Sequence, residues 1–257
     1  MENYKAHPQI KSAGAGAGAG LLSGLLGAGG GAVLVPLLRD WIGLDEKKAM
    51  ATSVFCIAPI SAVSAGIYIA SGKMNWQTAW SYMLGGFFGG IAAGFLFAKT
   101  PPGWLRRGFG LLLLLGSARQ WFSSLGGEVP VWDSFFPSAC AGLLTGALSG
   151  FGLGGGTLLM IWMTVFGGLD QHAAQGVNLL YFLPCSAGSM VGHIKNRQIA
   201  WKPALSAIAA GLPAGLLCAF AAQKLDAKPL RTGLGILMAV IGLREVFFKQ
   251  KKPVENQ

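Results

Sequence analysis

Long apolar runs dominate the chain, and short polar stretches separate them. Six runs come close to the length at which a helix crosses the hydrocarbon core of a bilayer, about 20 residues. They are residues 49–71, 76–98, 108–122, 173–194, 201–222 and 230–248. Further apolar sequence, rich in glycine and alanine, precedes the first run and follows residue 135. The pattern predicts an all-α polytopic membrane protein.

Two of the apolar segments are interrupted by glycines in the same way, as GAGGGA at 27–32 and GLGGGT at 152–157. With an offset of about 125 positions the match continues through Pro59 and Pro184 and through Trp76 and Trp201. The chain is therefore interpreted as two copies of one unit. Its predicted parts are an N-terminal segment 1–12, repeat 13–122, a loop 123–135, repeat 136–248 and a basic tail 249–257.

Consecutive glycines weaken a helix by about 1 kcal/mol each relative to alanine, so the two clusters are interpreted as helix breaks. Two equivalent halves, each with a broken apolar segment in the same position, indicate a transporter binding site. A different role is predicted for the glycines spaced along a single run, where small residues are typical of close helix packing. These are Gly85, Gly86, Gly89, Gly90 and Gly94.

The distribution of Lys and Arg favours inverted repeats. If each broken segment is a re-entrant hairpin, with arms 13–26 and 32–42 in the first repeat, each repeat keeps three transmembrane helices. The basic residues then divide about 15 to 5 in favour of the cytoplasmic side, which also holds both termini. If the broken segment spans the membrane instead, eight spans form two parallel repeats and the division is about 11 to 9. The eight-span arrangement is the structural alternative.

Composition excludes several other classes. The chain has 53% hydrophobic and 12% charged residues and a net charge of +10. Its basic residues flank the apolar runs, which is typical of membrane loops and not of a nucleic-acid surface. The glycine clusters lack the layout of a nucleotide site, and no metal, cofactor or catalytic constellation is evident, so no enzyme is predicted. The four cysteines, which form no CxxC pair, are interpreted as small buried packing residues: Cys56, Cys140, Cys185 and Cys218.

The breaks themselves favour an anionic substrate. A helix that restarts inside a membrane presents unpaired N–H groups and the positive end of its dipole, and glycines let an anion approach that backbone closely. All ten acidic residues lie near the ends of runs or in loops, which disfavours a cation carrier. The predicted substrate-binding residues are Gly29, Gly30, Gly31, Ala32, Thr52, Ser53, Gly154, Gly155, Gly156, Thr157, Gln175 and Asn178.

Three further polar residues have predicted roles outside the binding site. Asp45 and Asp170 each follow Gly-Leu and are expected to cap the next helix. His193 lies near the end of its run beside Lys195 and is expected at the membrane interface, not in a proton relay.

The sequence GAGGGAVLVPLL followed by GLDEKKAMATS, with GLGGGTLLMIWM followed by GLDQHAAQGVN, resembles the TauE/SafE family over nearly the whole chain. The resemblance implies an inner-membrane transporter of sulfite, sulfonates, thiosulfate or related small organic anions. It also implies site residues at the two glycine breaks and at Ala51-Thr52-Ser53. The second half departs from the pattern, with Ile161 where the first has Pro36 and Gly176-Val177-Asn178 in place of Ala-Thr-Ser. These differences argue against a symmetric pair of sites.

We therefore expect a multi-pass transporter of the plasma (inner) membrane that works by alternating access. Its expected partners are a small-molecule anion and the lipid bilayer. Assembly into homo-oligomers is compatible with the sequence, and no nucleic-acid partner is expected. An anion channel and a non-transporting membrane accessory protein are the alternatives. The sequence specifies neither the substrate, the coupling ion nor the direction of transport.

Overall fold

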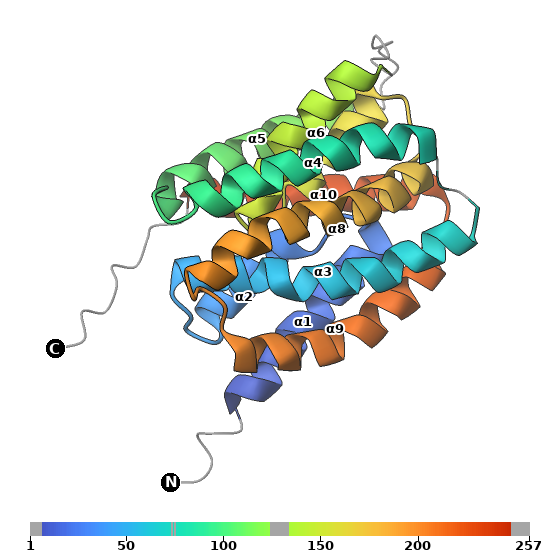
Figure 1. The fold of residues 1–257 in the computed structure, drawn as a ribbon. Helices are drawn as coiled ribbons and strands as arrows, with labels where there is room; N and C mark the ends of the chain where they lie inside the picture. Colours follow the sequence, from blue (N-terminus) through green and yellow to red (C-terminus); the bar gives the residue numbers. More distant parts are fainter. Residues whose placement is uncertain (1–6, 73, 75, 124–133, 248–257) are drawn as a thin grey trace, which may run out of the picture.

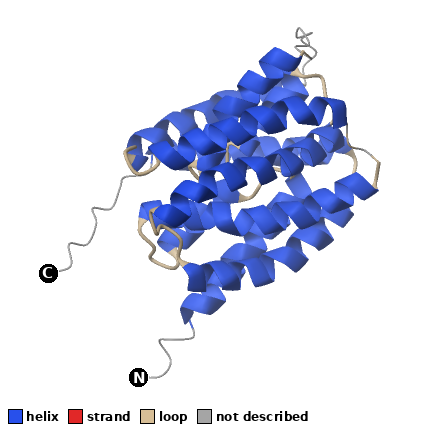
Figure 2. Cartoon of the chain, viewed as in Figure 1, coloured by secondary structure: helices blue, strands red, loops and turns tan. Residues whose placement is uncertain are grey.

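The computed structural model describes residues 7–72, 74, 76–123 and 134–247. Helices account for nearly all of them, and no strand occurs in these ranges (Figure 2). The prediction of an all-helical protein is confirmed.

The two halves of the chain have the same order of elements (Figure 1). The helices of the first half are α1 (His7–Leu26), α2 (Gly31–Asp40), α3 (Glu46–Ala70), α4 (Trp76–Leu96) and α5 (Pro102–Ser123). Those of the second half are α6 (Phe135–Gly150), α7 (Gly156–Ile161), the π-helical η1 (Trp162–Phe166), α8 (Gln171–Lys195), α9 (Trp201–Ala222) and α10 (Ala227–Phe247).

The surface of the bundle is apolar. Helices α3, α4 and α9 are each long and apolar enough to cross a bilayer. Large apolar side chains are exposed on several helices, among them Phe95, Phe136 and Leu217. A water-soluble protein rarely exposes so many, whereas a lipid environment accommodates them. These features are those of a membrane protein.

Glycine seams hold the closest helix pairs together. Helix α1 packs along α9, and α4 packs along α6. A methyl group on Gly20 would lie 2.3 Å from the Gly211 carbonyl oxygen, and one on Gly85 would lie 2.1 Å from that of Ala139. A methyl group on Gly90 would likewise lie 2.1 Å from the Cys185 carbonyl oxygen. Backbones this close require glycine, and the packing role predicted for the glycines of residues 76–98 is confirmed.

Each half of the chain packs mainly against the other. Besides the α1–α9 and α4–α6 pairs, α3 contacts α8 and α5 contacts α10. Gly176, near the start of α8, lies against Tyr68, near the end of α3, so these two central helices run in opposite directions. The halves are therefore intertwined and do not form two separate lobes.

The chain reverses direction at each glycine cluster. A methyl group on Gly30 would lie 2.5 Å from the carbonyl oxygen of Ala19, so α2 runs back along the helix that precedes it. In the second half, a methyl group on Gly155 would lie 2.2 Å from the carbonyl oxygen of Thr145, so α7 runs back along α6. Each cluster is thus the tip of a helical hairpin.

Some boundaries differ from those expected. Helix α1 begins at His7 and has 20 residues, so the first arm is longer than the expected 13–26 because the polar residues before Ala13 extend the same helix. The returning segment of the second half changes to a π-helix at Trp162. The predictions for residues 1–6, for most of the inter-repeat loop (124–133) and for the tail (248–257) concern positions outside the described residues.

Candidate functional site at the two glycine breaks

The first break joins α1 to α2 through residues 27–30. Gly30 precedes α2 with φ of 60°, in the left-handed region that favours glycine. At the start of α2, Val33 and Leu34 donate their N–H groups to the Gly30 carbonyl, at 3.2 and 2.9 Å. The N–H groups of Gly31 and Ala32 precede the first helical hydrogen bonds, so they are the donors that this helix leaves for an outside acceptor.

The second break meets the first. Gly154 has φ of 89°, and a methyl group on it would lie 2.6 Å from the backbone nitrogen of Ala32. A methyl group on Gly31 would in turn lie 3.6 Å from Gly154 and from the Gly152 carbonyl oxygen. Two segments that are far apart in the sequence therefore bring their helix starts to one point. Of the predicted residues, Gly31, Ala32 and Gly154 make this contact, and Gly29, Gly30 and Gly155 flank them in the chain.

Side chains from the central helices hold the two breaks in place. Asn178 on α8 donates its amide Nδ2 to the Gly27 carbonyl oxygen at 2.5 Å. Ser53 on α3 donates its hydroxyl to the Met50 carbonyl at 2.8 Å and also lies 3.3 Å from that of Gly152. Both side chains are fully buried. Each break is thus fixed by a helix from the opposite half.

Two more of the predicted residues bind backbone carbonyls at the hairpin tips. Thr157 donates its hydroxyl to the Gly154 carbonyl at 2.7 Å. Gln175 donates its side-chain nitrogen to the Leu25 carbonyl at 3.2 Å and accepts from the Tyr68 hydroxyl at 2.8 Å. In this arrangement the side chains shape the breaks, and the backbone N–H groups of Gly31 and Ala32 are the donors without a helical acceptor.

Thr52 is the predicted residue that lies apart from the breaks. Its hydroxyl oxygen accepts a hydrogen bond from the Ala200 backbone at 3.0 Å, so it fixes the connection between α8 and α9. The reason is geometric: successive residues point about 100° apart around a helix, so Thr52 and Ser53 face different neighbours.

Sequence reasoning missed the contacts of Tyr68 and His193. Tyr68 is fully buried and its hydroxyl lies 3.4 Å from the Gly24 carbonyl oxygen. His193 is also fully buried, with Nε2 2.8 Å from the Gly150 carbonyl oxygen and its ring against Phe97. His193 is therefore buried within the bundle, and its position at the membrane interface stays a prediction. The signal was the repeat itself, because the two residues are 125 positions apart and both contact the first arm of a hairpin.

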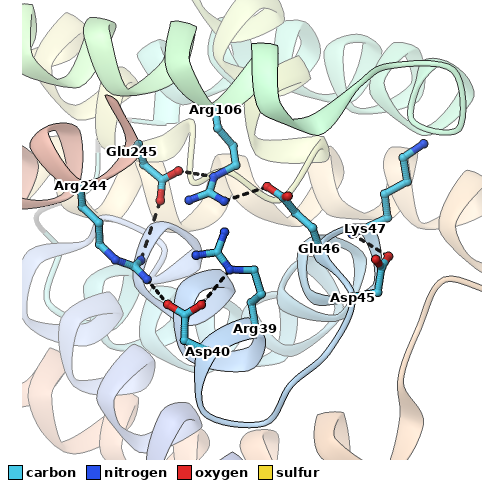
Figure 3. A network of polar contacts seen from close by, with 8 residues as sticks. All are labelled: Arg39, Asp40, Asp45, Glu46, Lys47, Arg106, Arg244 and Glu245. Carbon is cyan, nitrogen blue, oxygen red and sulfur yellow. Dashed lines mark hydrogen bonds and ion pairs between the residues drawn. The ribbon is translucent and has the colours of Figure 1, made fainter. Parts of the chain in front are cut away.

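An ionic network closes one end of the bundle (Figure 3). Arg106 on α5 is buried between Glu46, at 2.8 Å, and Glu245 on α10. Asp40, the last residue of α2, pairs with Arg39 at 2.8 Å and with Arg244 of α10. Three positive and three negative groups balance, and they tie the return arm of the first hairpin to α3, α5 and α10.

Other predictions have mixed outcomes. The side chains of Asp45 and Asp170 accept hydrogen bonds from the N–H groups of Lys47 and His172, as expected for helix caps. Cys56 and Cys185 are buried as predicted, whereas Cys140 is exposed, so that prediction is wrong. Across the described residues no group of three His, Cys, Asp or Glu side chains is placed to hold a metal ion.

Comparisons with known proteins identify a family and relatives named as membrane transporters. A profile described as Sulfite exporter TauE/SafE matches residues 12–245. A probable membrane transporter protein of Xylella fastidiosa is 25% identical over 91% of this chain and 93% of its own length. One from Methanocaldococcus jannaschii is 24% identical over 87% and 90%. The probable membrane transporter protein YunE of Bacillus subtilis is 38% identical over 28% of this chain and 26% of its own length.

Proposed function

The chain belongs to the sulfite exporter TauE/SafE family, and we propose that it is a secondary transporter of a small sulfur-containing or organic anion. Sulfite, sulfonates and thiosulfate represent the substrate class. Backbone N–H groups at the two glycine breaks hold the anion, and alternating access carries it across the membrane.

The observation that carries this proposal is the meeting of the two breaks. The start of α2 lies against Gly154, just before the helical segment Gly156–Phe166. Each helix start contributes the positive end of its dipole. The predicted substrate-binding residues include no charged side chain, so the local potential comes from these backbone groups and suits an anion better than a cation.

The directions of the helices support inverted repeats with re-entrant hairpins. Helix α1 runs parallel to α9, since Gly16 and Gly20 face Ala207 and Gly211 in the same order. The hairpin tips lie against the opposite central helices, Gly27 against Gln175 and Gly152 against Met50. A two-fold relation between the halves explains both contacts and matches the repeat architecture in which transporters place a substrate site between broken helices.

The distribution of charge supports one orientation. The end that carries the ionic network is rich in basic residues, including Lys47, Lys48, Arg106 and Arg244. The positive-inside rule assigns this end to the cytoplasm. Since α1 begins and α10 ends on this side (Figure 1), both termini are cytoplasmic in this proposal. Its partners are the anion and the bilayer of the plasma (inner) membrane. Assembly into homo-oligomers is compatible with this proposal.

A thermal-shift screen of the purified protein in detergent tests the substrate class. The compounds are sulfite, thiosulfate, sulfate, taurine, sulfoacetate, lactate and a set of cations. A ligand at about 100 times its Kd adds about 2.7 kcal/mol to the free energy of unfolding. Stabilisation by a sulfur anion or an organic anion supports the proposal, and stabilisation by cations alone contradicts it.

A conservative variant locates the site. Gly31→Ala places a methyl group at van der Waals distance from Gly152 and Gly154, so the fold is retained while the approach to the helix start narrows. The matched control is Gly18→Ala, whose methyl group has no neighbour within 4 Å. Anion stabilisation is expected to fall in Gly31→Ala and to persist in Gly18→Ala. Flux that does not saturate with concentration indicates the channel alternative, and a protein that binds no anion indicates the accessory role.

A further inference from the structure

Asn178 contacts both glycine breaks at once. Its Nδ2 donates to the Gly27 carbonyl oxygen of the first break at 2.5 Å. A methyl group on Gly156, where the second helix restarts, would lie 2.9 Å from Nδ2 and 3.0 Å from Oδ1. The residue is 1% exposed. The amide of Asn178 therefore lies where the two breaks meet.

The amide oxygen of Asn178 has no hydrogen-bond partner among the described residues. Its identity follows from chemistry: the Gly27 carbonyl only accepts hydrogen bonds, so the nitrogen must face Gly27 and the other atom is the oxygen. A buried acceptor without a donor is destabilising, and buried polar groups of this kind are normally satisfied by a partner. The oxygen is thus available to a donor that arrives at the breaks.

The equivalent position of the first half carries no amide oxygen. Ser53 places a hydroxyl there, and this hydroxyl donates to the Met50 carbonyl and lies near that of Gly152. Thr157, beside the second break, donates to Gly154. Of the side-chain polar atoms of Ser53, Thr157, Gln175 and Asn178, the Asn178 oxygen alone lacks a hydrogen-bond partner among the described residues.

We propose that Oδ1 of Asn178 accepts a hydrogen bond from the substrate, so that the site selects small anions that carry their own O–H or N–H group. The backbone N–H groups hold the anionic head, and Asn178 recognises a hydroxyl or amino group close to it. Hydroxy- and aminosulfonates and hydroxycarboxylates fit this description, and simple alkyl anions of the same size do not. This inference rests on the proposed function, because it requires the anion site at the breaks.

Two pairs of anions test the inference with the purified protein in detergent. In the first pair, 2-hydroxyethanesulfonate is compared with propane-1-sulfonate, in which a methyl group replaces the hydroxyl. In the second, lactate is compared with 2-methylpropanoate, which makes the same replacement on a carboxylate. The Kd values are measured by calorimetry. One hydrogen bond predicts about 3- to 10-fold tighter binding of the hydroxylated member.

The variant Asn178→Ser provides the second measurement. Serine is the residue at the equivalent position of the first half, where its hydroxyl lies 3.3 Å from the Gly152 carbonyl, and the substitution removes the amide oxygen. The preference is expected to fall below about twofold, with binding of the alkyl member unchanged.

Each outcome decides between the two proposals. Equal binding of both members of each pair by the wild-type protein overturns the inference and leaves the anion site standing. A preference that persists in Asn178→Ser overturns the role of Asn178. If no member of either pair binds while thiosulfate or sulfite stabilises the protein, the inference fails and the anion site stands. If none of these anions binds, both proposals fail.

Discussion

Ser53 and Asn178 hold opposite glycine breaks. Ser53, in the first half, lies 3.3 Å from the Gly152 carbonyl of the second break, and Asn178, in the second half, donates to the Gly27 carbonyl of the first. They are 125 positions apart, so they are the same position of the repeat. Because each break is fixed by a helix of the other half, a shift of α3 against α8 moves both breaks together.

Removing the Ser53 hydroxyl is expected to destabilise the protein. The Ser53→Ala variant deletes a buried donor that serves the Met50 carbonyl and lies near that of Gly152. The expected loss is about 1 kcal/mol in the free energy of unfolding. Thermal unfolding in detergent measures it, with Ser206→Ala as the control, because the Ser206 hydroxyl donates only to the preceding turn of α9. Equal melting temperatures for the two variants contradict the bracing role of Ser53.

The meeting of the breaks could be anticipated in part. The repeat offset identified both clusters and placed Ser53, Gln175 and Asn178 near them. The sequence could not distinguish a side chain that binds substrate from one that binds a backbone carbonyl, because both roles need the same buried donor. Thr52 illustrates a different limit: its neighbour Ala200 lies on a loop whose path depends on packing over the whole bundle.

The glycine seams predict opposite effects of the same substitution. Gly85→Ala places a methyl group 2.1 Å from the Ala139 carbonyl, and the backbones of α4 and α6 must separate. A loss of about 1–3 kcal/mol is expected. Gly66→Ala on α3 meets nothing within 4 Å, so the higher helix propensity of alanine stabilises it by up to about 1 kcal/mol. Thermal unfolding in detergent measures the change in stability of both variants. If both are destabilised by the same amount, the close packing of α4 and α6 does not require glycine at position 85.

Topology can be tested with three exposed positions. Inverted repeats place Lys48 and Arg197 on the cytoplasmic side and Lys224 on the other side, whereas the eight-span arrangement places Lys48 and Lys224 together. Lys48→Cys, Arg197→Cys and Lys224→Cys are each labelled with a membrane-impermeant maleimide in intact cells, with the wild-type protein as baseline. Labelling of the Lys224 variant alone is the expected result. Labelling of the Lys48 and Lys224 variants, with Arg197→Cys protected, supports eight parallel spans.

The ionic network lay beyond the reach of the sequence. The basic residues at this end could be assigned to one side from the charge pattern, but the pairing of Arg106 with Glu46 and Glu245 joins three helices that are distant in the chain. Hydropathy places charges near helix ends and does not say which ends meet. The acidic residues of this end have no charged counterpart in the matching positions of the other half. The positions equivalent to Glu46 and Glu245 are the neutral residues Gln171 and Gln120.

That comparison leads to a prediction about how the network stabilises the fold. Arg106 is buried, so Arg106→Ala leaves Glu46 and Glu245 without their main partner, and a loss of about 3–5 kcal/mol is expected. The double variant Glu46→Gln and Glu245→Gln keeps Arg106 and reproduces the residues of the second half, where Arg231 occurs with Gln171 and Gln120. Amide oxygens still accept from the guanidinium, so one hydrogen-bonded charge lacks an ion partner, where Arg106→Ala leaves two carboxylates without theirs.

The double variant is therefore expected to unfold at a higher temperature than Arg106→Ala, although it removes two charges and not one. Arg107→Ala, at an exposed neighbouring position, is the control and should match the wild-type protein within about 0.5 kcal/mol. Thermal unfolding of the four proteins in detergent makes the comparison. If the double variant is the less stable, paired charge itself stabilises this end, and the glutamines found in the second half are not equivalent substitutes.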